Sequence, residues 1–139
     1  MTENQDLAGS GTPNLLLVED DPAFANLLKW VLDGAMNVEV RERAEDVLEL
    51  VDAGWPNLIV SDLHMPRMTG IELYQLLRGH ATGKHLPFAL LTGAYEDDKV
   101  KAPLPEARAA GIEVILSKDL GLDGLREQIK RFYVEACRA

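Results

Sequence analysis

The chain has 139 residues, of which 47% are hydrophobic and 27% are charged, and its formal net charge is -9. This length and balance suit one globular domain with a core of its own. The acidic balance argues against a nucleic-acid-binding protein, which needs a basic face. The longest apolar runs are too short to cross a bilayer.

Residues 1–12 are polar and contain two glycines and a serine, a composition typical of a loose tail. Residues 13–139 are interpreted as one domain. The first residues also lack the basic start and apolar stretch of a secretion signal. The single cysteine, Cys137, has no partner for an internal disulfide, which favours a reducing cytoplasm.

The pattern in the first half of the domain predicts a strand, a helix, a second strand and a second helix, in that order. The apolar run at 15–18 predicts a buried strand, and Pro22 after an acidic residue predicts a helix start. The alternation at 37–41 is typical of a half-exposed edge strand. The helix after residue 22 is expected to have an apolar face of Phe24, Leu27, Leu28 and Val31. The helix at 44–53 is expected to have an apolar face of Val47, Leu48 and Val51.

The second half repeats the alternation. The run at 58–61 ends in Asp62, Pro66 and Gly70 mark a loop, and Leu73, Leu76 and Leu77 then predict a helical face. Apolar runs at 88–91 and 112–116 predict two more strands. Between them, a charged run at 95–101 predicts low local stability, and prolines limit any helix to about 105–110. The last helix is expected to bury Leu122, Leu125, Ile129, Phe132, Tyr133 and Ala136.

Five alternating strands and helices predict an α/β fold, a doubly wound parallel sheet with helices on both faces. The alternating second strand belongs at an edge and the apolar first strand inside. The order 2-1-3-4-5 satisfies both requirements.

Polar residues follow four of these strands, and the carboxyl ends of parallel strands meet at one edge of a sheet. Glu19 and Asp20 follow the first strand, Asp62 the third, Thr92 the fourth and Lys118 the fifth. Alone, Asp62 is more often a turn or helix cap. Three carboxylates brought together require a cation, and hard oxygen ligands favour Mg²⁺.

A carboxylate nucleophile beside Mg²⁺, a hydroxyl and an ammonium group fits phosphoryl transfer, which depends on charge neutralisation and positioning. Lys118 is a candidate for holding an anionic oxygen, and Thr92 for donating to another. Gly93 is expected to leave room beside the acceptor.

The sequence resembles the receiver domain of two-component response regulators over roughly residues 14–138. Residues 17–21 (LVEDD) resemble the acidic opening of that family, and residues 62–70 match its D-x-x-M-P-x-x-x-G phosphoacceptor motif in full. Residues 91–93 (LTG) and 117–118 (SK) match its later signatures. The resemblance implies a flavodoxin-like fold.

The resemblance also implies that Asp62 receives a phosphoryl group from a histidine kinase or a histidine phosphotransfer protein. It implies Mg²⁺ bound by Asp20 and Asp62, with Glu19 acting through water and the backbone carbonyl of His64 as a further ligand. Such a domain is a phosphoacceptor that promotes only its own phosphorylation and dephosphorylation. It signals by contact with a downstream protein and needs neither nucleic acid nor membrane.

Three departures from the family pattern put its usual switch in question. Ile115 stands where an aromatic residue is usual, Asp119 stands where proline is usual, and the segment between Thr92 and Lys118 is longer and contains prolines. β-Branched Ile115 has a stiff χ1 and no ring to swing. A phosphorylation signal is therefore expected to change the nearby loops more than the distal face.

Other functions stay open. A receiver-like binding module that is never phosphorylated fits the departures. A phosphatase with an aspartate nucleophile usually has a second Asp two residues on, where this chain has His64. A flavin-binding module would not place Glu19 and Asp20 at a phosphate loop. Only 21 residues follow Lys118, and the last helix needs them, so a stand-alone receiver is expected. Its oligomeric state stays open.

Overall fold

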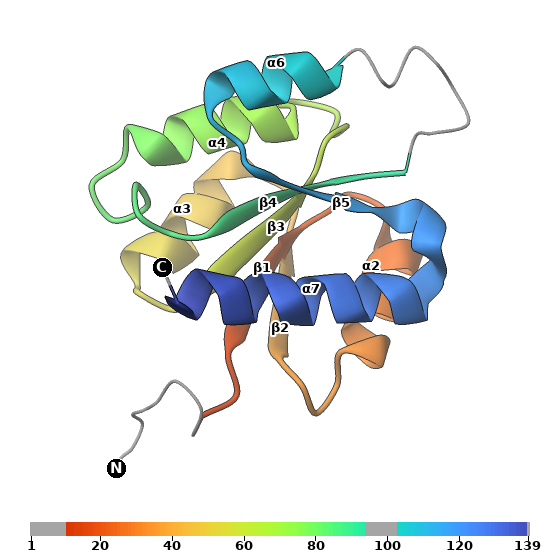
Figure 1. Cartoon of the computed structure of the whole chain (residues 1–139). Coiled ribbons are helices and arrows are strands. Elements are labelled where there is room, and N and C mark those ends of the chain that lie inside the picture. The colour runs from red at the N-terminus through yellow and green to blue at the C-terminus, as the bar shows by residue number, and fades with distance from the viewer. Residues whose placement is uncertain (1–10, 94–102, 139) are drawn as a thin grey trace.

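A computed structural model of the chain contains one five-stranded sheet with helices on both faces (Figure 1). It describes residues 11–93 and 103–138, apart from the side chains of 103 and 104. The strands are β1 (Asn14–Val18), β2 (Asn37–Arg41), β3 (Leu58–Asp62), β4 (Phe88–Thr92) and β5 (Val114–Ser117). The helices are α2 (Pro22–Val31), α3 (Ala44–Asp52), α4 (Gly70–Arg78), α6 (Pro103–Ala110), α7 (Gly121–Arg138) and the short 3-10 helix η1 (Lys118–Leu120).

The strand order is β2-β1-β3-β4-β5, and each neighbouring pair is parallel. The order predicted from the sequence is therefore confirmed. The alternating stretch forms the partly exposed edge strand β2, whereas β3 and β4 are buried along their whole length. Continuous apolar strands of this kind are what a parallel sheet covered on both faces requires.

The core consists of two clusters, one on each face of the sheet, because successive residues of a strand point to opposite faces. Leu15 and Leu17 of β1 belong to the cluster covered by α2 and α7, and Leu16 belongs to the cluster under α3, α4 and α6. Figure 1 shows α2 and α7 on one side of the sheet and the other three helices on the opposite side.

Two helices begin at polar caps beside strand ends. Asp21 caps α2, since its carboxylate accepts from the backbone N–H of Ala23, and Pro22 occupies the first helical position. Thr69 and Glu72 form a capping box at the start of α4. These caps fix the chain directions just beyond β1 and β3, where the acidic residues lie.

Several details differ from the sequence prediction. Leu27 and Leu76 were expected in the core but are 50% and 38% exposed, because the buried stripe of α2 runs through Ala25 and Leu28 and that of α4 through Tyr74 and Leu77. Helix α6 begins at Pro103, since the first turn of a helix tolerates proline, and β5 begins at Val114. The charged run at 95–101 and most of the expected tail lie outside the described residues.

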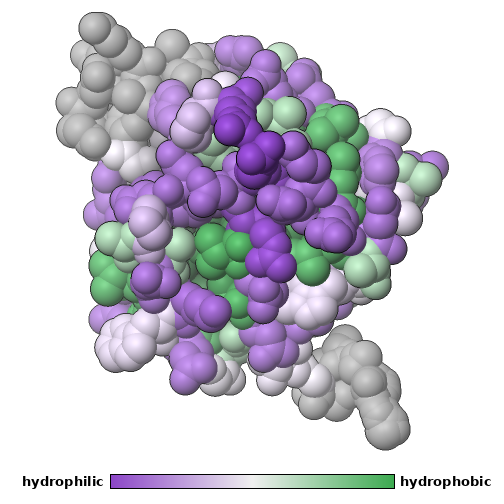
Figure 2. Space-filling model, turned by 180° about the vertical axis from the view of Figure 1, so that it is seen from behind, coloured by the Kyte–Doolittle hydropathy of each residue, from purple (hydrophilic) through white to green (hydrophobic). Residues whose placement is uncertain are grey.

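The surface is mainly polar. Figure 2, which views the molecule from behind, shows hydrophilic side chains over most of that face and hydrophobic side chains in separate patches. In the described part of the chain, no helix combines the length and the hydropathy that a membrane crossing needs.

Candidate functional site

The residues predicted from the strand ends meet at one edge of the sheet. Glu19 directly follows β1, Asp62 is the last residue of β3, Thr92 the last of β4, and Lys118 directly follows β5. Carboxylate oxygens of Glu19, Asp20 and Asp62 all lie within 4.8 Å of one another. Glu19, Asp62 and Thr92 are buried, and Asp20 is partly exposed.

Lys118 joins the acidic residues through its ammonium group. Its Nζ lies 3.0 Å from Oδ1 of Asp62 and 3.2 Å from Oε1 of Glu19. Oε2 of Glu19 accepts a hydrogen bond from the backbone N–H of Asp21 at 3.1 Å. The side chain of Glu19 is thereby held between the start of α2 and the end of β5.

The site raises the pKa of both buried carboxyl groups. Burial raises the pKa of Glu19 above its ordinary 4.5, and the Asp62 charge adds to this, against the opposing effect of Lys118. Burial also raises the pKa of Asp62 above 3.8, again against Lys118. Burial alone would lower the pKa of Lys118, but Asp62 and Glu19 outweigh it and raise the pKa above 10.5. Burial is thus the main cause that raises the pKa of both carboxyl groups, and Lys118 opposes it.

The donor set fits a small hard cation. Three carboxylates face one ammonium group, and oxygen ligands with room for water and a phosphate oxygen are what Mg²⁺ prefers. Among the described residues, Oε1 of Glu19 is buried without a well-aligned hydrogen-bond donor, although Lys118 lies within ion-pair distance. His64, whose carbonyl the resemblance adds to the set, follows β3 with an exposed side chain.

Two glycines allow close packing around the site. A Cβ on Gly70 would lie 2.5 Å from the backbone oxygen of Asp62, so only glycine fits there without a shift of the backbone. A Cβ on Gly93 would lie 3.0 Å from both Cβ and Cδ of Lys118. The space at Gly93, predicted to lie beside the acceptor, is therefore filled by the stem of Lys118.

One neighbour of the site, Phe24, is not predicted by the sequence pattern. Phe24, interpreted only as part of an apolar helix face, places its ring centroid 4.4 Å from Nζ of Lys118. Its position in the first turn of α2, four residues after Asp20, is the signal in the sequence that it would lie near the site. Helical periodicity alone assigned it to the core.

The two departures that the structure describes lie on and after β5. Ile115 is half-buried against the cluster under α3, α4 and α6, in register with Leu90 of β4. Because strand residues alternate, Ile115 and Thr92 belong to the same face of the sheet. Asp119 is exposed in η1, and its backbone N–H donates to Oγ of Ser117 at 3.0 Å.

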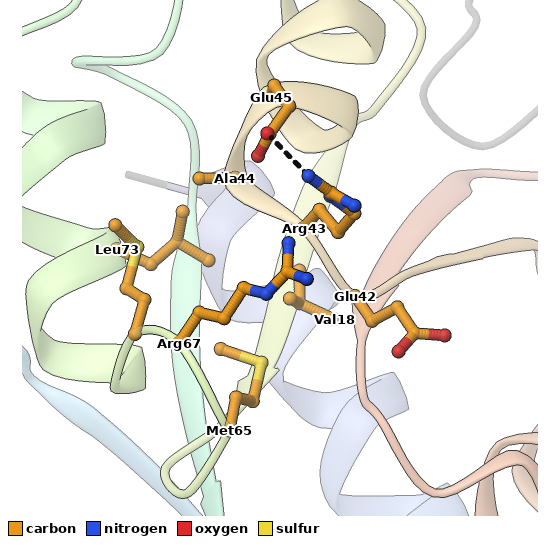
Figure 3. A pocket seen from close by; sticks show the side chains of 9 residues that line it. Val18, Glu42, Arg43, Ala44, Glu45, Met65, Arg67 and Leu73 are labelled. Carbon is orange, nitrogen blue, oxygen red and sulfur yellow. Dashed lines mark hydrogen bonds and ion pairs between the residues drawn. The ribbon is translucent and has the colours of Figure 1, made fainter.

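A small cavity of about 130 Å³ lies beside the loop that follows Asp62. Met65, Met68, Val18 and Leu73 supply its apolar lining. In Figure 3 the guanidinium group of Arg67 extends toward Arg43, and the guanidinium group of Arg43 points to Glu45, with which it pairs at 3.1 Å. The loop after Asp62 and the start of α3 thus line this cavity together.

Comparisons with known proteins agree with this geometry. A family model described as "Response regulator receiver domain" matches residues 15–130. The chain is 27% identical over 121 residues to the chemotaxis protein CheY of Pseudomonas aeruginosa, covering 86% of this chain and 94% of that protein. It is 39% identical over 92 residues to an uncharacterized 14.6 kDa protein of Leptolyngbya boryana, covering 64% and 70%.

A solved structure shows the same architecture. A putative response regulator from Chloroflexus aurantiacus superposes with a TM-score of 0.75 at 27% identity, covering 89% of this chain and 99% of that one. The fold of this chain is thereby matched to that of a response regulator.

Proposed function

The chain belongs to the family of response regulator receiver domains, and on that premise we propose that Asp62 accepts a phosphoryl group in a two-component signalling pathway. The observation that carries the proposal is the contact of Asp62 with Lys118 inside a cluster of three carboxylates. Asp62 is the buried carboxylate that ends β3, at the edge where α/β sheets place chemistry.

The donor is a phosphohistidine on a histidine kinase or on a histidine phosphotransfer protein. A carboxylate oxygen of Asp62 attacks phosphorus, the new O–P bond forms, and the P–N bond to the imidazole breaks. The bond electrons leave with the imidazole nitrogen. Hydrolysis later returns the carboxylate and inorganic phosphate, so the domain promotes reactions of its own aspartate only.

Each neighbour has an electrostatic role. Lys118 holds a phosphoryl oxygen as a point charge, and the hydroxyl of Thr92 donates to another. A bound Mg²⁺ supplies charge neutralisation for the transferred group. Asp20 and Asp62 would hold the ion directly, Glu19 through water, and His64 through its backbone carbonyl.

The signal then passes by protein–protein contact to a downstream target. Asp119 directly follows Lys118 and is exposed, so a partner that reads the loops around the site would meet this carboxylate. A receiver-like module that is never phosphorylated is the competing function. The cytoplasmic location expected from the lone Cys137 stays a prediction.

Acetyl phosphate with Mg²⁺, followed by intact mass, separates these functions. Wild-type protein is expected to gain one phosphoryl group, and Asp62→Asn to gain none. Asp33→Asn, at an exposed turn after α2, is the matched control and should label like wild type. Equal labelling of Asp62→Asn would contradict the assignment of the acceptor, and no labelling of wild type would favour the binding module.

A further inference from the structure

Three groups from two parts of the chain, residues 19–24 and the end of β3, surround the ammonium group of Lys118. Oδ1 of Asp62 lies 3.0 Å from Nζ, Oε1 of Glu19 lies 3.2 Å away, and the ring centroid of Phe24 lies 4.4 Å away. From this arrangement we infer that Phe24 is a positioning residue that holds the Lys118 ammonium at the acidic cluster. The inference rests on the proposed function of the site.

The ring attracts the cation electrostatically. The face of a phenyl ring carries partial negative charge, and a lysine ammonium within about 6 Å of the centroid is stabilised by it. The side chain of Lys118 is only 24% exposed, so water screens this attraction less than on an open surface. The long flexible stem of a lysine otherwise lets its head group sample several positions.

Phe24 differs from the two carboxylates because its interaction does not depend on the state of the site. Asp62 changes charge and shape when it is protonated or phosphorylated, and Glu19 changes when it is protonated or shared with a cation. The ring is neutral in every state. It is therefore the contact that keeps Nζ in place while Asp62 reacts.

The start of α2 places the ring rigidly. Asp21 caps this helix, and its carboxylate accepts from the N–H of Ala23 at 3.0 Å. The N–H of Asp21 itself donates to Glu19. Phe24 also packs against the cluster under α2 and α7. Glu19 and Phe24, two of the three groups around Lys118, thus come from one short segment whose geometry is fixed by hydrogen bonds.

A double-mutant cycle tests the inference. Phe24→Leu is expected to slow the phosphorylation of Asp62 by acetyl phosphate about fivefold, the factor that a partly buried cation–π contact supplies. Phe24→Tyr keeps an aromatic face and should restore the rate. In a Lys118→Met background, Phe24→Leu should change the rate less than about twofold. Equal slowing in both backgrounds would overturn the inference.

A second readout does not require phosphorylation. The NMR order parameter of the Lys118 ε-methylene should fall in Phe24→Leu and be kept in Phe24→Tyr. Leu27→Ala, one turn along the same helix at an exposed position, is the control and should change neither the order parameter nor the rate. Phe24→Met gives the same comparison if the leucine variant folds poorly.

Different results would overturn the role of Phe24 and the proposed phosphorylation of Asp62. An unchanged order parameter in Phe24→Leu would overturn the role of Phe24, whether or not the protein is labelled. Absence of labelling in wild type would overturn the proposed function, while the order parameter would still decide whether Phe24 positions Lys118.

Discussion

A Cβ on Gly70 would lie 2.5 Å from the backbone oxygen of Asp62 and 2.6 Å from Cδ1 of Leu90. Helix α4 therefore begins directly against the last residue of β3. The N–H of Gly70 also donates to the carbonyl of Leu63 at 2.9 Å, which closes the intervening loop. The eight-residue spacing from Asp62 to Gly70 thus reflects a steric requirement at the site.

Gly70→Ala is expected to destabilise the protein. The new methyl group meets the backbone of Asp62 as well as the buried side chain of Leu90, and overpacking of this kind costs about 1–3 kcal/mol. This exceeds the gain of up to about 1 kcal/mol that alanine brings to a helix. Urea unfolding measures the loss. Gly79→Ala is the control, because its Cβ would meet nothing closer than 3.8 Å, and a variant as stable as that control would contradict the steric argument.

Divalent metal should stabilise the fold. A ligand that binds only the native state raises the melting temperature by mass action, and Asp20→Asn should reduce the effect of Mg²⁺. Without metal, Asp20→Asn should stabilise the protein by about 1 kcal/mol, because it removes repulsion with Asp62. Thermal unfolding in Mg²⁺ and in EDTA measures both changes. Asp33→Asn should alter neither, and a destabilised metal-free Asp20→Asn would contradict a shared acidic cluster.

The raised pKa of Asp62 predicts how stability depends on pH without metal. A carboxyl group whose folded pKa lies above 3.8 stabilises the fold below pH 3.8, and this contribution is lost as the pH rises through the folded pKa. Relative to Asp62→Asn, which cannot ionise there, wild type should gain stability as the pH falls from 7 toward 4. Urea unfolding in EDTA across this range measures the difference. A relative loss of stability at low pH would refute the pKa direction.

Phosphorylation should change the loops after β4 and β5 more than the distal face. A switch needs two packings of similar energy, and Ile115 is held against the helix-covered core without a ring to relocate. Amide chemical shifts with and without beryllofluoride, a phosphoryl mimic, provide the test. Shifts across residues 114–116 and 122–136 as large as those near Asp62 would refute it.

The sheet was predictable because its signals are local. Apolar runs of strand length, separated by helical periodicity, fix five strands, and the alternation at 37–41 identifies the edge. Helix faces were predicted less well. Leu27 fits the helical period but is 50% exposed, because the buried stripe of α2 runs through Ala25 and Leu28.

The residues of the site were predictable where they lie at the carboxyl ends of strands. Glu19, Asp20, Asp62 and Lys118 converge because parallel strands share one edge. The contact of Phe24 with Lys118 joins residues 94 positions apart, and it depends on the angle at which α2 leaves the sheet. No pattern within the sequence specifies that angle.

The first and last helices cover the same face of the sheet, and this order affects folding during synthesis. Nε of Arg126 in α7 donates to the carbonyl of Val31 in α2 at 3.2 Å, and Leu125, Ile129 and Phe132 complete that side of the core. Chains emerge from the ribosome amino terminus first, at roughly 5–20 residues per second. On this face α2 is the only one of these two helices to have emerged before residues 121–138, so this side of the core is completed late.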